Sequence, residues 1–244
     1  MMPLILAYHS VSDGRSSDFY SVSRKTLADQ LCWLADAGYE FVSLESLVRR
    51  QQRKPAVLTF DDGYRDFLTC AFPILQRRGV PGTAFLVTDM LGKTAQWDGD
   101  SNRTPLMTAA EAREVKAGGI SLGSHTLTHA NLTTVRAGEL QRQLVASRQA
   151  LADLGETFFS LSYPWGRCTK REAVAAQAAG YQCAVTAGRS VRSDVYRLGR
   201  LVVNRNLDLT SFGRAVLQFE KNKPIAGVLR AIARTAKLRW HGSR

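Results

Sequence analysis

The sequence has little of what marks a disulfide scaffold, an exported protein or a membrane protein. Its 244 residues contain four cysteines, and these show neither CxxC spacing nor the density of a disulfide-rich domain. The N-terminal stretch MMPLILAYHSVSDG has no basic segment, and its apolar run ends at His9, too soon for a signal peptide or a membrane span. We therefore expect a reduced, soluble, cytoplasmic protein.

Acidic residues are also scarce, with 21 Asp and Glu against 33 Lys and Arg, which gives a formal net charge of +12. This balance indicates anionic partners, but no recognisable nucleic-acid-binding motif is present, so nucleic acid is not expected as a partner. Residues 221–244 contain seven Lys and Arg and no acidic residue. This basic C-terminal tail is either a helix that contacts an anionic membrane surface or one that packs on the domain.

Short apolar runs alternate with longer segments of helical periodicity. This alternation predicts a parallel sheet covered by helices, either an open doubly wound sheet or a barrel. No linker divides the series, so we expect a single domain over residues 1–220. The expected strands are 4–11, 56–60, 83–88, 120–125, 158–164 and 183–187, and the expected helices are 26–38, 66–79, 108–119, 138–155 and 170–180.

Ionisable and polar groups follow several of the expected strands. His9 comes near the end of the first apolar run, Asp61 and Asp62 follow residues 56–60, and His125 ends residues 120–125. Because the carboxyl ends of parallel strands meet at one edge of a sheet or barrel, these side chains are expected to lie together. The chain has only four histidines, and three of them belong to this set or lie close to it.

His125 and His129 are four residues apart in SHTLTH, which on a helical turn would place two imidazoles on one face. Two histidines and a carboxylate form an open three-ligand metal site, and we assign Asp62 as the third ligand. Such an ion would lower the pKa of a bound water and polarise a carbonyl oxygen. The alternative for the Asp-Asp pair is a turn at Asp62 and a helix cap at Asp61.

Asp61 is then free to act as a general base, because neighbouring side chains on a strand point to opposite faces. Hydrolysis of an amide also needs an acid that protonates the departing amine, and His9 is the candidate for this role. The alternative for His9 is a buried histidine with a hydrogen bond near Tyr8.

These residues resemble the polysaccharide deacetylases, the carbohydrate esterase family that includes chitin and peptidoglycan deacetylases. The resemblance spans about residues 4–205 and is carried by TFDDGY, SHTLTH and YPWG. It implies a distorted (β/α) barrel of about seven units and metal-dependent removal of acetyl groups from N-acetylated sugars. LAYHSVSD is similar to the N-terminal segment of a circularly permuted branch, the poly-N-acetylglucosamine deacetylases, in which the acid histidine comes first.

One departure from the family concerns the third motif, where Ser162 stands at the usual position of an arginine. In the family, this arginine usually forms a salt bridge with the catalytic base. Arg200 is a candidate to supply that guanidinium instead, and we group it with the substrate-binding residues. From YPWG, the backbone N–H of Trp165 is expected to face the oxyanion, and Tyr163, Pro164 and Trp165 are expected to contact the sugar, unless they only pack at the rim.

The sequence therefore predicts a metal-dependent hydrolase that removes N-acetyl groups from an N-acetylhexosamine in a glycan or glycan precursor. Zinc is the expected metal, with cobalt, nickel and iron as alternatives. The same site would also suit O-acetyl esters, formyl sugars or a non-sugar amide. A basic nucleic-acid-binding protein is the alternative from another class.

Overall fold

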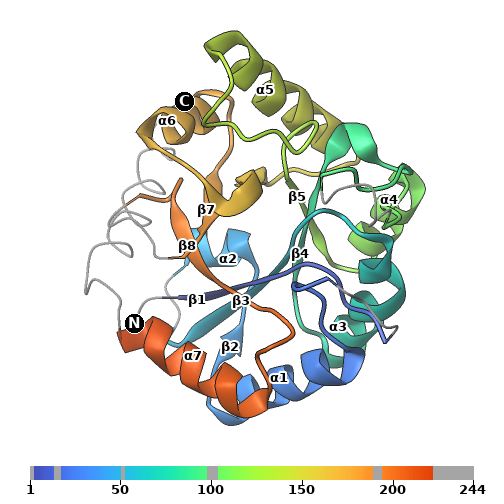
Figure 1. The fold of residues 1–244 in the computed structure, drawn as a ribbon, viewed down its shortest axis with the longest axis vertical. Coiled ribbons are helices and arrows are strands. Elements are labelled where there is room, and N and C mark those ends of the chain that lie inside the picture. The colour runs from blue at the N-terminus through green and yellow to red at the C-terminus, as the bar shows by residue number, and fades with distance from the viewer. Residues whose placement is uncertain (1–2, 14–17, 51–52, 98–103, 189–193, 222–244) are drawn as a thin grey trace.

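The computed structural model describes most of the chain as one (β/α) barrel (Figure 1). The described residues are 3–13, 18–50, 53–97, 104–188 and 194–221. The predicted basic tail lies outside them except for Lys221, the last residue of the final helix. No helix among the described residues is long and apolar enough to cross a membrane.

All strand pairs of the sheet are parallel, in the order β1-β8-β7-β6-β5-β4-β3-β2. β1 pairs with both β8 and β3, so seven strands close into a barrel and β2 lies outside the ring beside β3. The predicted barrel of about seven units is confirmed. The strands are β1 (Leu4–Tyr8), β2 (Glu40–Phe41), β3 (Pro55–Phe60), β4 (Thr83–Leu86), β5 (Ser121–Ser124), β6 (Ser160–Ser162), β7 (Cys183–Ala187) and β8 (Leu198–Val202).

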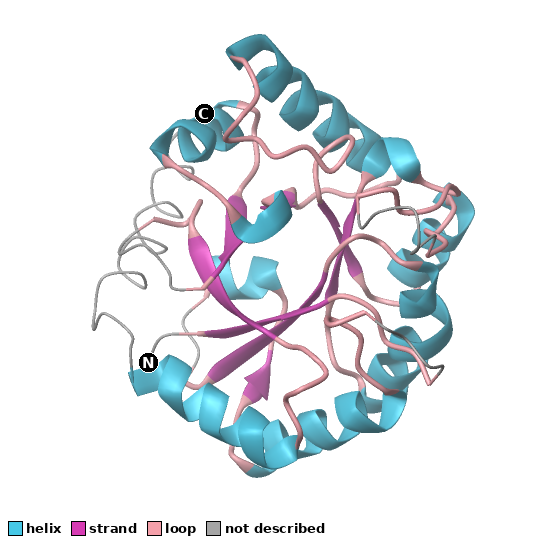
Figure 2. Cartoon of the chain, viewed as in Figure 1, coloured by secondary structure: helices cyan, strands magenta, loops and turns pink. Residues whose placement is uncertain are grey.

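Most of the helices surround the strands on the outside of the barrel, whereas the short α2 is seen through the middle of the ring in this view (Figure 1, Figure 2). Several begin at a side-chain cap: Thr108 and Thr169 each form a capping box with the glutamate three residues later. The helices are α1 (Arg24–Asp36), α2 (Leu44–Arg49), α3 (Phe72–Arg78), α4 (Ala109–Ala117), α5 (Ala137–Asp153), α6 (Lys170–Ala178) and α7 (Leu209–Lys221). Three single turns complete the set: the π-helical η1 (Phe67–Ala71) and the 3-10 turns η2 (Thr88–Met90) and η3 (Pro164–Gly166).

Several elements of the fold differ from the sequence prediction. β2, α2, β8 and α7 were not predicted, and the first two, with two and six residues, are too short to establish a period. The expected helix over 66–79 begins with the π-helical turn η1 and becomes α-helical only at Phe72. Single π turns inside helices are frequent at functional sites, and this one begins five residues after Asp62.

The barrel is stabilised by strands that are buried on both faces. Every residue of β1 and β3 is buried, which is why these segments read as continuous apolar runs without alternation. Because the strands are parallel, their carboxyl ends open at one end of the barrel. His9 follows β1, Asp61 follows β3 and His125 follows β5, so the fold brings these three residues to that end.

Candidate active site

The two adjacent carboxylates are separated by a backbone turn. Asp61 continues the line of β3, with its N–H donating to the carbonyl of Tyr8 at 2.9 Å. Asp62 then adopts a left-handed conformation with φ 70°, and Gly63 follows with φ 73°. The carboxylates therefore face different partners, as predicted, but the cause is this turn rather than strand alternation alone.

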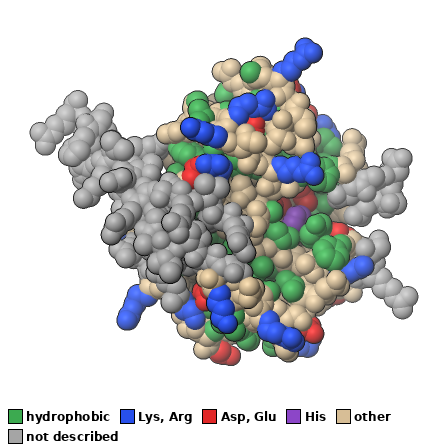
Figure 3. All heavy atoms as spheres, turned by 60° about the vertical axis from the view of Figure 1, so that its left-hand side comes forward, with side chains coloured by type: hydrophobic (Ala, Val, Ile, Leu, Met, Phe, Trp, Pro, Cys, Tyr) green, Lys and Arg blue, Asp and Glu red, His purple; other side chains and the backbone are tan. Residues whose placement is uncertain are grey.

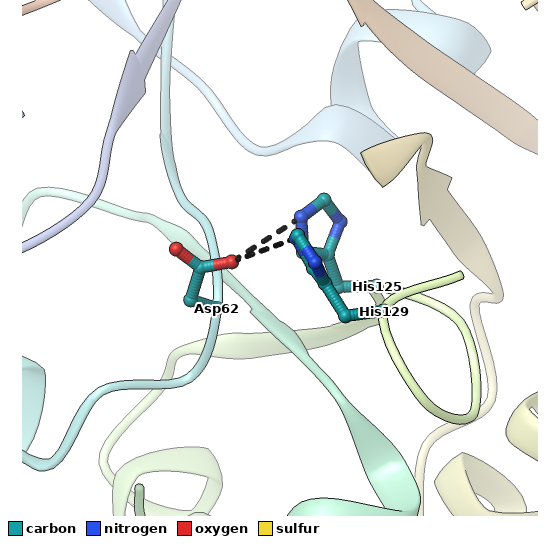
Figure 4. Close-up of side chains that lie close together, drawn as sticks. All are labelled: Asp62, His125 and His129. Carbon is teal, nitrogen blue, oxygen red and sulfur yellow. Dashed lines mark ion pairs between the residues drawn. The ribbon is translucent and has the colours of Figure 1, made fainter. Parts of the chain in front are cut away.

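Asp62, His125 and His129 form a buried cluster (Figure 4). Asp62 Oδ1 lies 3.4 Å from Nε2 of His125 and 3.4 Å from Nε2 of His129. Relative exposure is 4% for Asp62, 2% for His125 and 7% for His129. The sequence pattern had predicted a helical turn for the two histidines. They instead flank a tight turn in which Thr126 has φ 68° and His129 has φ 61°.

The donor set and its spacing fit a divalent cation. Two ligands about 2.1 Å from a tetrahedral ion are about 3.4 Å apart, which matches both measured distances. Asp62 Oδ1 is buried without a hydrogen-bond partner among the described residues, as expected of an oxygen that binds an ion. Nδ1 of His125 lies 2.8 Å from the Ser162 carbonyl, which can only accept, so Nδ1 donates and leaves Nε2 free toward Asp62.

The protonation of His125 agrees with this role. Burial lowers the pKa of His125 to about 4, although Asp61 and Asp62 act in the opposite direction. The imidazole is therefore neutral near pH 7, and a metal ligand must be neutral. The carbonyl of Ser162 fixes the ring orientation as well as the tautomer.

Asp61 is held by a guanidinium from β8. Arg200 Nη1 donates to Oδ1 at 2.7 Å and Nη2 to Oδ2 at 2.6 Å, so the pair is bidentate. Ser162, at the position of the family's usual arginine, donates to Oδ2 at 3.1 Å and accepts from Arg200 Nη2 at 2.9 Å. The remaining donors of Arg200 are directed to Thr59 Oγ1 and the Thr186 carbonyl.

This arrangement determines the charge of Asp61. Burial by itself would raise its pKa, but the charge of Arg200 and, to a smaller extent, His125 outweigh burial and hold the pKa well below its ordinary value. Arg200 is 2% exposed, and its guanidinium forms a buried salt bridge with the Asp61 carboxylate. Arg200 therefore supplies the guanidinium that the sequence suggested for it. It also lines the cleft, and its grouping with the substrate-binding residues stays a prediction.

His9 lines the same cleft as the carboxylates and the histidine pair. Its ring stacks on Tyr20, with ring centroids 4.8 Å apart. Nδ1 of His9 is buried without a hydrogen-bond partner among the described residues. Tyr8 does not account for His9, because the Tyr8 hydroxyl donates to Gln30 at 2.8 Å.

In the YPWG segment, Tyr163 and Pro164 pack inside the fold, whereas Trp165 lines the cleft. Tyr163 is fully buried and its hydroxyl donates to the Tyr196 carbonyl at 3.0 Å, so the prediction that it contacts sugar is wrong. Pro164 is also buried and begins η3, and neither residue lines the cleft. Trp165 does line it, is 52% exposed, and lies 5.0 Å from the His129 ring.

The cleft has a volume of about 240 Å³. In the space-filling view, histidine and acidic side chains lie together in a hollow bordered by hydrophobic side chains (Figure 3). Sequence reasoning missed Trp97, whose ring stacks on His129 with centroids 4.3 Å apart. Trp97 lies in a loop with no neighbouring motif, so no local signal pointed to it.

Left-handed backbone at non-glycine residues is concentrated at this site. Among the described residues, the non-glycine positions with positive φ are Asp62, Thr126, His129 and Trp165, and three of these line the cleft. Such conformations cost about 1–3 kcal/mol each and persist where the surrounding structure enforces them. Their clustering supports a functional site.

Comparison with known proteins shows the family of the chain and agrees with the barrel fold. A family model described as polysaccharide deacetylase matches residues 49–184, more than half of the chain. The Bacillus subtilis protein YxkH, assigned to the polysaccharide deacetylases, is 30% identical over 219 residues, which cover 86% of this chain and 74% of YxkH. The chain belongs to the polysaccharide deacetylase family.

Two further proteins are similar to this chain, one in sequence and one in structure. The poly-β-1,6-N-acetyl-D-glucosamine N-deacetylase of Staphylococcus epidermidis is 23% identical over 208 residues, covering 77% of this chain and 69% of that protein. The Streptococcus pyogenes deacetylase PplD, solved in complex with acetate, superposes with a TM-score of 0.74 at 23% identity, covering 87% of this chain and 97% of PplD. This structural likeness confirms the fold.

Proposed function

We propose that the protein is a metal-dependent N-deacetylase that hydrolyses the acetamido group of an N-acetylhexosamine within a glycan. The observation that carries this proposal is the pairing of two different carboxylates at the bottom of one cleft. Asp61 is kept ionised by Arg200, and the adjacent Asp62 forms a cluster with His125 and His129. Membership in the polysaccharide deacetylase family supports the class of reaction.

Asp62, His125 and His129 would hold the metal, for which zinc suits two imidazoles and a carboxylate, with cobalt, nickel or iron as alternatives. When bound, a divalent ion supplies Lewis acidity toward the acetyl carbonyl and lowers the pKa of water. The chain contributes the neutral His125 ring, oriented by the Ser162 carbonyl, and the buried oxygen of Asp62.

Asp61 is the proposed general base. Its carboxylate is ionised and buried, and Arg200 and Ser162 fix both of its oxygens. His9, on another side of the cleft, is the proposed general acid that protonates the departing amine. Trp165 is proposed to hold the oxyanion through its backbone N–H and to offer its exposed ring to the sugar.

The substrate is proposed to be a chain of N-acetylated hexosamine units. The Staphylococcus epidermidis relative is a deacetylase of poly-β-1,6-N-acetyl-D-glucosamine. An open cleft that carries an exposed indole at its edge suits a sugar ring held by stacking.

The test is acetate release from N-acetylglucosamine oligomers of different linkage, together with O-acetyl esters and sugar nucleotides. Metal-stripped protein would be assayed with and without added zinc or cobalt. We expect acetate from at least one N-acetyl oligomer, restored by metal and absent in Asp61→Asn. Release from O-acetyl esters alone would reassign the substrate, and activity unaffected by complete metal removal would contradict the proposal.

A further inference from the structure

A third carboxylate, that of Asp66, lies just beyond the Asp-Asp pair, at the position where three chain segments meet. Asp66 directly precedes the π-helical turn η1. Its Oδ2 accepts a hydrogen bond from Ser10 Oγ at 2.5 Å, across 56 residues of sequence. Ser10 Oγ also lies 3.1 Å from Ser21 Oγ. The carboxylate thus connects the loop after β1, the segment before α1 and the loop after β3.

The directions of these hydrogen bonds follow from the acceptor. An ionised carboxylate can only accept, so the Ser10 hydroxyl donates its proton to Asp66. Ser10 Oγ can then only accept from Ser21, which orders the chain as Ser21 to Ser10 to Asp66. Ser10 and Ser21 are both 7% exposed, so water does not readily replace these contacts.

Each serine directly follows an aromatic residue of the cleft. Ser10 follows His9 and Ser21 follows Tyr20, and the rings of His9 and Tyr20 stack at 4.8 Å. The two backbones are joined as well, because Val22 N–H donates to the Ser10 carbonyl at 3.1 Å. A displacement of the Ser10 backbone would therefore displace His9 and, through the contact with Val22, the segment that carries Tyr20.

Asp66 maintains this contact at an electrostatic cost. Burial and, to a smaller extent, nearby Asp18 raise its pKa to about 6, although the Ser10 hydroxyl and the backbone N–H groups of Val11 and Phe67 act in the opposite direction. Those donors all favour the ionised carboxylate of Asp66. In this form the carboxylate can only accept, so the Ser10 hydroxyl must donate its proton to it.

We propose that Asp66 is a positioning residue for the deacetylation: through Ser10, it holds His9 at the place from which His9 protonates the leaving amine. This inference rests on the proposed function and adds a residue to it. Asp66 touches no reacting atom, so its effect passes entirely through His9.

The test compares two kinds of substrate. Amide hydrolysis needs a protonated amine as leaving group, whereas an aryl acetate releases a stable phenolate without an acid. In Asp66→Ala we expect kcat for an N-acetyl oligomer to fall roughly 10- to 100-fold, with most of the aryl acetate hydrolysis retained. The matched control is Asp208→Ala, which removes a carboxylate that accepts from Ser211 N–H at the start of α7, away from the cleft.

A double-variant cycle decides whether the effect passes through His9. In a His9→Ala background, adding Asp66→Ala should cost less than twofold, because there is no acid left to position. Equal loss on amide and ester, or a full additional loss in the His9→Ala background, would overturn the positioning role. Asp66→Asn, which keeps an oxygen acceptor for Ser10, should recover at least part of the amide activity.

Failure of this inference and failure of the proposed function give different results. Wild-type protein that releases acetate from an amide in a His9-dependent manner, but whose kcat is unchanged in Asp66→Ala, would refute the positioning role alone. Wild-type protein that releases no acetate from any amide would refute both. If Asp66→Ala folds poorly, its aryl acetate rate reports the folded fraction and Asp66→Asn replaces it in the cycle.

Discussion

The guanidinium of Arg200 donates two hydrogen bonds, of 2.7 and 2.6 Å, to the two carboxylate oxygens of Asp61, although the residues are 139 positions apart in the sequence. Both side chains are almost completely buried, at 2% and 4% exposure. The pair joins β8 to the end of β3 across the barrel end, and Ser162 from β6 completes it.

Removal of the guanidinium should therefore cost both stability and activity. In Arg200→Met, a buried carboxylate loses its countercharge, and we expect the free energy of unfolding to fall by about 3–5 kcal/mol. Acetate release should be lost because Asp61 no longer stays ionised in position. Urea unfolding checks the first effect. The control is Arg142→Met, which breaks the exposed pair with Glu139 and should change stability far less.

Substitution of the proposed base should separate turnover from metal binding. Asp61→Asn keeps the shape of the side chain but cannot accept a proton, so turnover should fall by a factor on the order of 10²–10⁴. Metal content, measured by mass spectrometry on the purified variant, should remain equal to that of wild type. Near-normal turnover in this variant would remove Asp61 from the mechanism.

Metal binding should depend on the Asp-His-His cluster and can be measured without any substrate. Added zinc should raise the melting temperature of metal-stripped wild-type protein, because a ligand that binds only the folded state stabilises it. The shift should vanish in His125→Ala and in Asp62→Ala. His9→Ala is the matched histidine control and should keep the full shift; if it lost the shift instead, the ligand set would need revision.

Trp165 and Tyr163 are neighbours in sequence with different expected roles. Trp165→Ala should raise KM for oligomers several-fold, because an exposed stacking surface is removed. Tyr163→Phe should leave the kinetic constants unchanged and lower stability by about 0.5–1.5 kcal/mol, since it loses the hydrogen bond to the Tyr196 carbonyl. Steady-state kinetics and urea unfolding of both variants distinguish the roles.

The pH dependence of stability should show the raised pKa of Asp66. Its pKa of about 6 in the folded protein lies above the ordinary value near 3.9, so the folded state binds a proton that the unfolded state releases between these values. Stability from this group is fully present below about pH 4 and is lost as the pH rises through 6. Asp66→Asn lacks this dependence.

The stability of Asp66→Asn relative to wild type should therefore increase between pH 4 and pH 7, by on the order of 2 kcal/mol. Urea unfolding of both proteins across this range measures the difference. A constant difference would show that the pKa of Asp66 is not raised, and the contribution from neighbouring Asp18 can be isolated with Asp18→Asn.

Much of the fold was accessible from local sequence patterns. The alternation of apolar runs and helical segments predicted most strands and most helices, because buried parallel strands and amphipathic helices have distinct periods, but β8 and α7 were not among the predicted elements. The pattern left an open sheet and a barrel as alternatives, since only the pairing of β1 with both β3 and β8 distinguishes them. Residues 40–49 escaped prediction because β2 and α2 are too short to show a period.

For the site, the sequence determined which residues are available and that His9, Asp61, Asp62 and His125 reach one end of the fold, because strand ends are local features. Tertiary structure alone decided their partners. Arg200 was a candidate guanidinium from the sequence, but only the fold set its two hydrogen bonds to Asp61. The fold also buried Tyr163 in the packing layer and placed Trp97 against His129 and Asp66 against Ser10. These contacts join residues distant in sequence, and their geometry depends on how the barrel closes rather than on any local pattern.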